Sequence, residues 1–267
     1  MINHIECCDC LQFMSSMPEN SVDLVVTSPP YALRRKDTYG GIDERMYPSW
    51  FFSVASKLYR ILKPSGSFVL NIKENVIDGV RSPYVEKTLV LLRGLFRFSD
   101  TFIWVKTNPF PTGSNRRLKD GFEYCYWFTK SEDYKFYPDN VLVPSVSEYF
   151  QSEMRRQNKG AHDTTNGSGM NMSKRYVAEY VRPSNVLTFP VDSTNHVHPA
   201  AFPKKLPLFF IKLMSDEGDL VFDPFCGSGT TCLAARDSGR NYLGCDVQQE
   251  YVTIARNRLF TCMDSLF

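Results

Sequence analysis

Short apolar runs typical of buried strands alternate along the chain with longer stretches whose apolar residues recur at helical spacing. We expect strands at 21–27, 67–72, 101–105, 122–128 and 241–246, a further strand beginning at 220, and helices at 49–62, 84–96, 202–214, 232–236 and 248–259. Strands and helices that alternate in this way build a sheet covered by helices on both faces. The sequence therefore predicts an α/β fold with a doubly wound, mostly parallel sheet.

The composition fits a globular protein but does not identify a partner. The 267 residues are 43% hydrophobic and 22% charged, which is enough apolar material for a sizeable core. The 31 Lys and Arg residues exceed the 29 Asp and Glu residues by only two, so any nucleic-acid partner must be argued from local features. The N-terminal segment has no apolar core of a signal peptide, and no stretch approaches the ~20 apolar residues of a membrane span. We expect a cytoplasmic protein with no membrane partner.

The eight cysteines do not have the spacing of a metal site. Cys7, Cys8 and Cys10 lie close together, but no second pair and no His partner follows at zinc-site spacing. We expect reduced thiols and no bound metal.

The alternation of strands and helices fades between about 131 and 188. Residues 151–175 are polar and rich in Gly, Asn and Ser, so we expect a mobile surface segment there. Residues 151–185 hold six Lys or Arg against three Asp or Glu, a local basic bias. A long loop of this kind is either functional or a solvated linker.

A Gly-rich turn, Cys226 to Thr231, joins a predicted strand to a predicted helix. Gly227 and Gly229 permit a sharp turn and close approach of a ligand, and the N-terminus of the following helix attracts an anionic group. No Lys follows the second glycine, which excludes a phosphate loop, and Cys232 stands where the dinucleotide fingerprint has its third glycine. Asp246, at the end of the next strand, can accept hydrogen bonds from a ribose diol. An adenosine-containing ligand is one interpretation, and a turn that merely needs glycine is the other.

A second rigid loop, Thr27-Ser28-Pro29-Pro30-Tyr31, follows the predicted strand 21–27 directly. The prolines fix φ and remove two N–H donors, so a carbonyl and the Ser28 hydroxyl are left to accept both protons of a nucleobase amino group. Tyr31 can stack on the base. Open α/β sheets bind ligands at the carboxyl ends of their strands, which favours a site over a proline-rigid turn with a packed tyrosine.

Together, the two loops resemble the catalytic and S-adenosylmethionine motifs of the DNA amino-methyltransferases. The catalytic loop precedes the cofactor loop, which is the order of the circularly permuted β class, and residues 198–206 are similar to the stretch that leads into the cofactor motif. The resemblance covers nearly the whole chain. It implies a Rossmann-like methyltransferase fold, circularly permuted, with a small irregular recognition insertion. The expected division is a catalytic half at 1–130, the insertion at 131–190 and a cofactor-binding half at 191–267.

The resemblance also assigns roles to individual residues. It implies S-adenosylmethionine as the cofactor, with Thr230 and Thr231 holding its methionine carboxylate, Asp246 its ribose and Asp9 its adenine. The residues that match the motifs are Ser28, Pro29, Pro30 and Tyr31 for catalysis, and Asp9, Asp223, Phe225, Gly227, Gly229, Thr230, Thr231 and Asp246 for the cofactor.

The activity that the resemblance implies is methyl transfer to the N4 amino group of a flipped-out cytosine in double-stranded DNA. Ser is the commonest first catalytic residue among cytosine-N4 enzymes, and the stretch 108–126 is similar to theirs. Adenine-N6 transfer and a non-catalytic module that keeps the fold remain alternatives. Cytosine-C5 chemistry needs a cysteine nucleophile, usually after a proline, and the chain contains no Pro-Cys dipeptide.

Local basic clusters are the candidates for contacts with DNA phosphates, and ordinary solvated charge is the alternative for each. They are Arg34, Arg35 and Lys36 after the catalytic loop, Arg116 and Arg117, and Arg155 and Arg156. The family resemblance alone implies a cognate restriction endonuclease, and both a monomer and a homodimer are compatible with these features.

Overall fold

The computed structural model describes residues 2–32, 41–109, 116–145, 180–191 and 202–261. Within these ranges the chain forms a central sheet of eight strands in the order β1-β12-β11-β2-β3-β7-β6-β10. Its strands are β1 (His4–Cys7), β2 (Val22–Thr27), β3 (Leu62–Ile72), β6 (Arg97–Lys106), β7 (Phe122–Thr129), β10 (Val186–Phe189), β11 (Leu220–Asp223) and β12 (Asn241–Asp246). β7 runs antiparallel to β3 and β6, and all other neighbours are parallel. The predicted mostly parallel sheet is confirmed.

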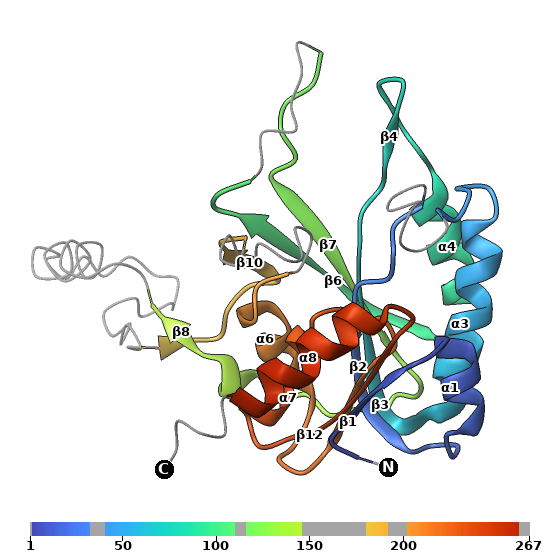
Figure 1. Ribbon diagram of the computed structural model, residues 1–267. Coiled ribbons are helices and arrows are strands. Elements are labelled where there is room, and N and C mark those ends of the chain that lie inside the picture. The colour runs from blue at the N-terminus through green and yellow to red at the C-terminus, as the bar shows by residue number, and fades with distance from the viewer. Residues whose placement is uncertain (1, 33–40, 110–115, 146–179, 192–201, 262–267) are drawn as a thin grey trace, which may run out of the picture.

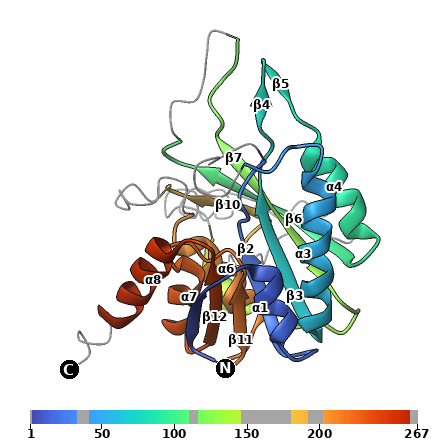
Figure 2. The ribbon, with the colours of Figure 1, turned by 45° about the vertical axis from the view of Figure 1, so that its right-hand side comes forward.

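Helices cover both faces of this sheet (Figures 1 and 2). On one face lie α1 (Cys10–Ser16), α3 (Tyr47–Ile61) and α4 (Tyr84–Arg93). On the other face lie α6 (Lys205–Met214), α7 (Thr230–Arg236) and α8 (Gln249–Thr261). None of the helices in the described ranges is long and apolar enough to cross a membrane.

The central strand β2 shows why the chain folds into three layers. Every residue of β2 is buried, but successive side chains point to opposite faces. Val25 joins the core under α1, α3 and α4, whereas its neighbours Leu24 and Val26 join the core under α6 and α7. A strand buried on both faces reads as a continuous apolar run, which is the pattern seen at 21–27.

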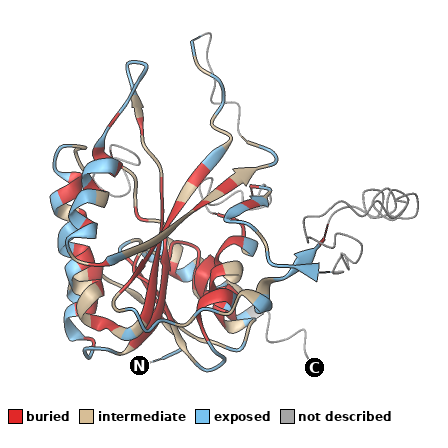
Figure 3. Cartoon of the chain, turned by 180° about the vertical axis from the view of Figure 1, so that it is seen from behind, coloured by how far each residue is buried: buried red, intermediate tan, exposed pale blue. Residues whose placement is uncertain are grey.

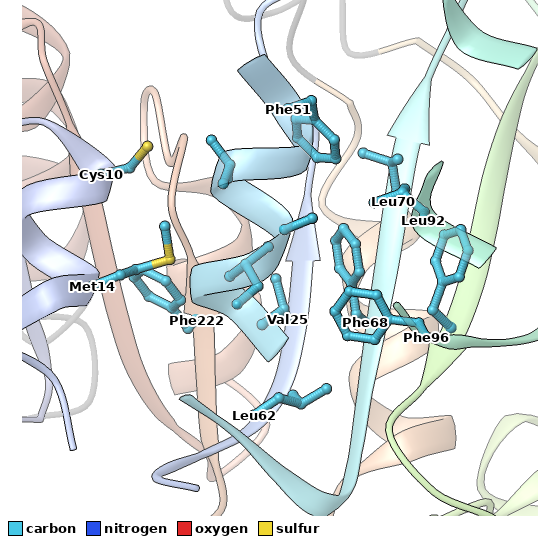
Figure 4. Close-up of a cluster of buried hydrophobic side chains, with 14 of the residues drawn as sticks. Cys10, Met14, Val25, Phe51, Leu62, Phe68, Leu70, Leu92, Phe96 and Phe222 are labelled. Carbon is cyan, nitrogen blue, oxygen red and sulfur yellow. The ribbon is translucent and has the colours of Figure 1, made fainter. Parts of the chain in front are cut away.

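The core beneath α3 consists of large apolar side chains from both layers (Figure 4). Phe51 of α3 and Met14 of α1 are fully buried, as is Phe68 of β3. Burying one such side chain stabilises the fold by about 2 kcal/mol. Packing on the sheet, more than intrinsic helix propensity, therefore holds these helices in place.

Small elements extend from the sheet and are more exposed (Figure 3). A hairpin of β4 (Val76–Ile77) and β5 (Val80–Arg81) follows β3 and projects beyond its carboxyl end (Figure 2). The 3-10 helix η1 (Pro138–Val141) precedes β8 (Val143–Pro144), which pairs with β9 (Tyr180–Val181).

The structure differs from the sequence prediction at several strands. β1 and α1 were not expected. The four residues of β1 include one buried side chain, and the seven residues of α1 make only about two turns of a helix, so neither shows a clear hydrophobic periodicity. β3 begins at Leu62, so residues expected to separate a helix from a strand belong to the strand itself. β10 pairs with β6, so the range 131–190 contributes one strand to the central sheet. The segment 151–175 lies outside the described residues.

Helices α7 and α8 approach each other closely at Gly229, the residue that precedes α7. Gly229 has φ +79°, and a Cβ placed on it would lie 2.8 Å from the Cβ of Ala255 in α8. Gly218 has a similar φ of +83°, but a Cβ there would meet no atom within 4 Å. A residue with a Cβ would be strained in its backbone at either position, but only at position 229 would the Cβ also collide with α8.

Replacing Gly229 by Ala is therefore expected to cost more stability than replacing Gly218. Gly218→Ala should lower the free energy of unfolding by about 1 kcal/mol through backbone strain alone. Gly229→Ala should lower it by about 1–3 kcal/mol more, because α8 must move away from α7. Urea unfolding of both variants measures the difference, and equal losses would contradict the close packing.

Candidate active site

The carboxyl ends of four parallel strands meet at one edge of the sheet and carry most of the residues singled out from the sequence. Asp9 follows β1, Ser28 follows β2, Asp223 ends β11 and Asp246 ends β12. Cys7 lies opposite Asp246 in the sheet register, and the N–H of Cys8 donates to the carbonyl of Asp246 at 3.0 Å. The fold thus places segments from both ends of the chain at a common edge, where α/β sheets bind ligands.

A buried hydrogen bond joins the two loops at this edge. The Thr27 hydroxyl donates to Oδ1 of Asp223 at 2.6 Å, and the N–H of Phe225 donates to the same oxygen at 3.1 Å. Asp223 is only 2% exposed, and this burial raises its pKa to about 6 although both hydrogen bonds favour the charged form. The end of β2, which begins the Ser28 loop, is thereby tied to the end of β11, which begins the Gly-rich loop.

The Gly-rich loop is shaped by groups from β12 and α8. Asp246 accepts the N–H of Gly227 at 3.0 Å with one carboxylate oxygen and the N–H of Gln248 at 2.9 Å with the other. Arg258 of α8 donates to the carbonyl of Ser228 at 2.6 Å. The loop is therefore held at both sides by charged side chains.

The two threonines at the start of α7 are buried. The hydroxyl of Thr231 lies 3.3 Å from the carbonyl of Val26 in β2 and donates to it, and Arg258 lies 3.3 Å from the Thr230 hydroxyl oxygen and donates to it. Their side chains therefore support the loop from within the protein.

Asp9 and Phe225 are the two remaining residues that the sequence predicted for the cofactor. Oδ1 of Asp9 accepts the N–H groups of Leu11 at 2.9 Å and Gln12 at 3.1 Å and so caps α1. The half-buried ring of Phe225 lies 5.8 Å from the ring of Trp50 in α3.

The catalytic loop contacts a charged pair that the sequence analysis did not single out. The Ser28 hydroxyl lies 3.3 Å from the Tyr31 hydroxyl, which lies 3.1 Å from a carboxylate oxygen of Glu123 in β7. The other oxygen of Glu123 accepts from Lys106 of β6 at 2.5 Å. Removal of the Tyr31 hydroxyl from water, together with the nearby Glu123 carboxylate, raises the pKa of Tyr31 well above its usual value. The only sequence signal was a carboxylate inside the apolar run 122–128.

One of the basic clusters lies near the same edge, beside the projecting hairpin. Arg116 is exposed, and Arg117 donates to Asp120 at 2.7 Å. Asp120 also pairs with Lys73 at 2.7 Å and Arg81 at 2.9 Å, and these cations hold its pKa below the usual range although its partial burial opposes the shift. The positions 34–36, 155 and 156 lie outside the described residues.

The described part of the chain contains no group of three or more His, Cys, Asp or Glu side chains arranged to bind a metal ion.

Comparison with known proteins identifies relatives along nearly the whole chain. Residues 22–257 match the family model N6_N4_Mtase, described as DNA methylase. The chain is 31% identical to the Type II methyltransferase M.PvuII of Proteus hauseri, over 94% of this chain and 81% of the relative. It is 28% identical to the DNA adenine methyltransferase YhdJ of Escherichia coli (strain K12), over 94% of this chain and 80% of the relative. The solved structure of PvuII DNA methyltransferase (cytosine-N4-specific) superposes with a TM-score of 0.75 at 29% identity, covering 97% of this chain and 87% of that one.

The raised pKa of Asp223 makes stability depend on pH. Below about pH 4 the carboxyl is protonated in both the folded and the unfolded state, but between pH 4 and pH 6 only the unfolded state loses the proton. The wild type is therefore expected to lose about 2–3 kcal/mol of stability relative to Asp223→Asn as the pH rises from 4 to 7.

Urea unfolding of both proteins across this pH range measures the effect. Asp139→Asn serves as the control, because the hydrogen bond from Arg182 lowers the pKa of this exposed carboxyl and gives it the opposite sign of pH dependence. The raised pKa of Asp223 would be contradicted if the free energies of unfolding of the wild type and Asp223→Asn differed by the same amount at every pH.

Proposed function

The chain belongs to the family of N6/N4 DNA methylases, and from this premise we propose that it transfers the methyl group of S-adenosylmethionine to the N4 amino group of a cytosine in double-stranded DNA. The observation that carries the proposal is the hydrogen bond between Thr27 and Asp223. It holds the Ser28-Pro29-Pro30-Tyr31 loop beside the Gly-rich loop, so that an amino group and a methyl donor can be bound next to each other.

The residues around the Gly-rich loop fit S-adenosylmethionine. Asp246 ends β12 beside the Gly-rich loop, and a carboxylate oxygen can accept more than one hydrogen bond, so this side chain is our candidate for the two hydroxyls of a ribose. Asp9 follows Cys8, whose N–H donates to the carbonyl of Asp246, and is our candidate for the adenine contact. Phe225, packed on Trp50, would offer an apolar surface. When bound, this cofactor supplies an electrophilic methyl group on a positively charged sulfur.

The start of α7 would hold the methionine carboxylate of the cofactor. The first N–H groups of a helix have no partner within the helix and attract anions. Because the Thr231 hydroxyl donates to Val26, we expect Thr231 to contribute its backbone N–H there rather than its side chain.

The catalytic loop would act on the target base by accepting hydrogen bonds. The lone pair of a cytosine amino group is delocalised into the ring, which makes the nitrogen a poor nucleophile. Acceptors at the Ser28 oxygen and the Pro29 carbonyl would draw both amino protons out of the ring plane and stabilise positive charge as the new N–C bond forms. The nitrogen then releases one proton without needing a strong base. The target must leave the duplex to reach the loop, and Tyr31 would stack on it.

Cytosine-N4 is the first choice of target and adenine-N6 the second. The relative with a solved structure is named cytosine-N4-specific, and Ser28 is the residue type most common in that group. The family model includes both activities, and one relative is named an adenine methyltransferase. The order of the catalytic and cofactor loops supports the β class. A role beside a restriction endonuclease rests on the family resemblance alone, and the division at 130 and 190 stays a prediction.

Incubation with labelled S-adenosylmethionine and unmodified DNA, followed by digestion to nucleosides, tests the reaction. N4-methylcytosine is the expected product, N6-methyladenine would establish the second candidate, and the absence of any methylated base would contradict both. Ser28→Ala should lower kcat about 10–100-fold, because one acceptor of the amino protons is lost, and should leave cofactor affinity unchanged. Ser53→Ala on the exposed side of α3 is the matched control, with kcat expected to be unchanged.

Arg116 is the basic residue in the described ranges that we propose to contact a DNA phosphate. Arg116→Ala should weaken binding to all DNA sequences alike and reduce the slope of log affinity against log salt concentration by about 1. Arg97→Ala, at the opposite edge of the sheet, should leave the slope unchanged. Fluorescence anisotropy at several salt concentrations measures both, and equal slopes for both variants and the wild type would exclude Arg116.

A further inference from the structure

A buried ion pair next to the catalytic loop has no part in the reaction as described above. The side chains of Glu123 and Lys106 are only 11% and 13% exposed, and their charged atoms lie 2.5 Å apart. Exposed ion pairs contribute little to stability, and buried pairs are costly to assemble from water. A pair in this place, in contact with Tyr31 through Glu123, therefore invites a functional explanation.

The chemistry of the four side chains fixes where each proton lies. The Lys106 ammonium can only donate, and the Glu123 carboxylate paired with it can only accept. The Tyr31 hydroxyl must then donate its single proton to Glu123, which leaves only lone pairs on the Tyr31 oxygen. The hydroxyl of Ser28, 3.3 Å from that oxygen, must in turn donate to it. The Ser28 oxygen is left with two lone pairs and no free proton.

We propose that Glu123, anchored by Lys106, is a positioning residue that acts through Tyr31 to hold the Ser28 hydroxyl as a hydrogen-bond acceptor for the target amino group. The inference rests on the amino-methyl transfer proposed above. An amide or carboxylate oxygen in the place of Ser28 would be an acceptor in every orientation. A serine hydroxyl is both donor and acceptor, and if its proton pointed at the amino group, two donors would oppose each other.

The pair thus solves a problem that is specific to serine. It sets the orientation of the Ser28 O–H bond before the substrate binds, so the hydroxyl does not have to reorient during the reaction. The raised pKa of Tyr31 agrees with this arrangement, because the phenol keeps the proton that it donates to Glu123.

Three variants and one control test the inference. Glu123→Gln keeps the shape of the side chain but can present an N–H to Tyr31, and Tyr31→Phe keeps the ring but removes the link. Each is expected to lower kcat about tenfold or more and to change the KM for S-adenosylmethionine less than about twofold. Glu132→Gln is the matched control, because Glu132 pairs with Arg97 at 3.0 Å at the other end of the same two strands. Its kcat should equal that of the wild type.

The double variant separates positioning from a merely structural role. If Glu123 acts through Tyr31, adding Glu123→Gln to Tyr31→Phe should lower kcat no further. Independent, multiplying losses would overturn the inference, as would a wild-type kcat in Glu123→Gln. Thermal unfolding shows whether Glu123→Gln folds, and Tyr31→Phe, which leaves the ion pair intact, decides the matter if it does not.

The same measurements distinguish this inference from the proposed function. A wild type that methylates DNA together with an equally active Glu123→Gln overturns the positioning role alone. A wild type that forms neither methylated base overturns the proposed function and the positioning role with it.

Discussion

The hydrogen bond from Thr27 to Asp223 is the contact on which the arrangement of the site depends. It joins residues 196 positions apart at the ends of two adjacent parallel strands. Burial of the Asp223 carboxyl raises its pKa, and the hydrogen bonds from Thr27 and Phe225 oppose part of that shift. A second and longer bond supports the same connection, because the Thr231 hydroxyl at the start of α7 donates to the carbonyl of Val26 in β2 at 3.3 Å.

At the amino ends of the central strands, a different buried carboxylate makes the connections. Asp23, near the start of β2, accepts from Lys63 of β3 at 2.8 Å and from the N–H of Leu220 at 3.0 Å. The strand β2 is thus tied to both of its neighbours at one end and to β11 at the other. Side-chain contacts at both ends of β2 therefore help to hold β11, β2 and β3 in register, and the Asp23 contacts do not involve the loops at the carboxyl ends of the strands.

The sequence predicted the central strands and the site loops because their signals are local. The centre of the run 21–27, Leu24 to Val26, is continuously apolar, and the two loops carry their prolines and glycines within a few residues. The short strands β1 and β10 were missed, because four residues at or near a sheet edge have no distinct pattern and are defined by the strand they pair with. Glu123 and Lys106 were missed for a related reason. Their pairing depends on the register between β6 and β7, which neither segment encodes alone.

The antiparallel strand β7 has a consequence for the chemistry of the site. In a parallel strand, the first residues would lie at the edge of the sheet that faces away from the loops. Because β7 runs the other way, Glu123 near its start lies at the same edge as Lys106 at the end of β6 and the loop that follows β2. Trp104 is the register partner of Glu123, which puts Lys106 two residues further along, within reach of the carboxylate. A change of strand direction in an otherwise parallel sheet therefore delivers a carboxylate to the catalytic loop from a strand most of whose other residues are buried.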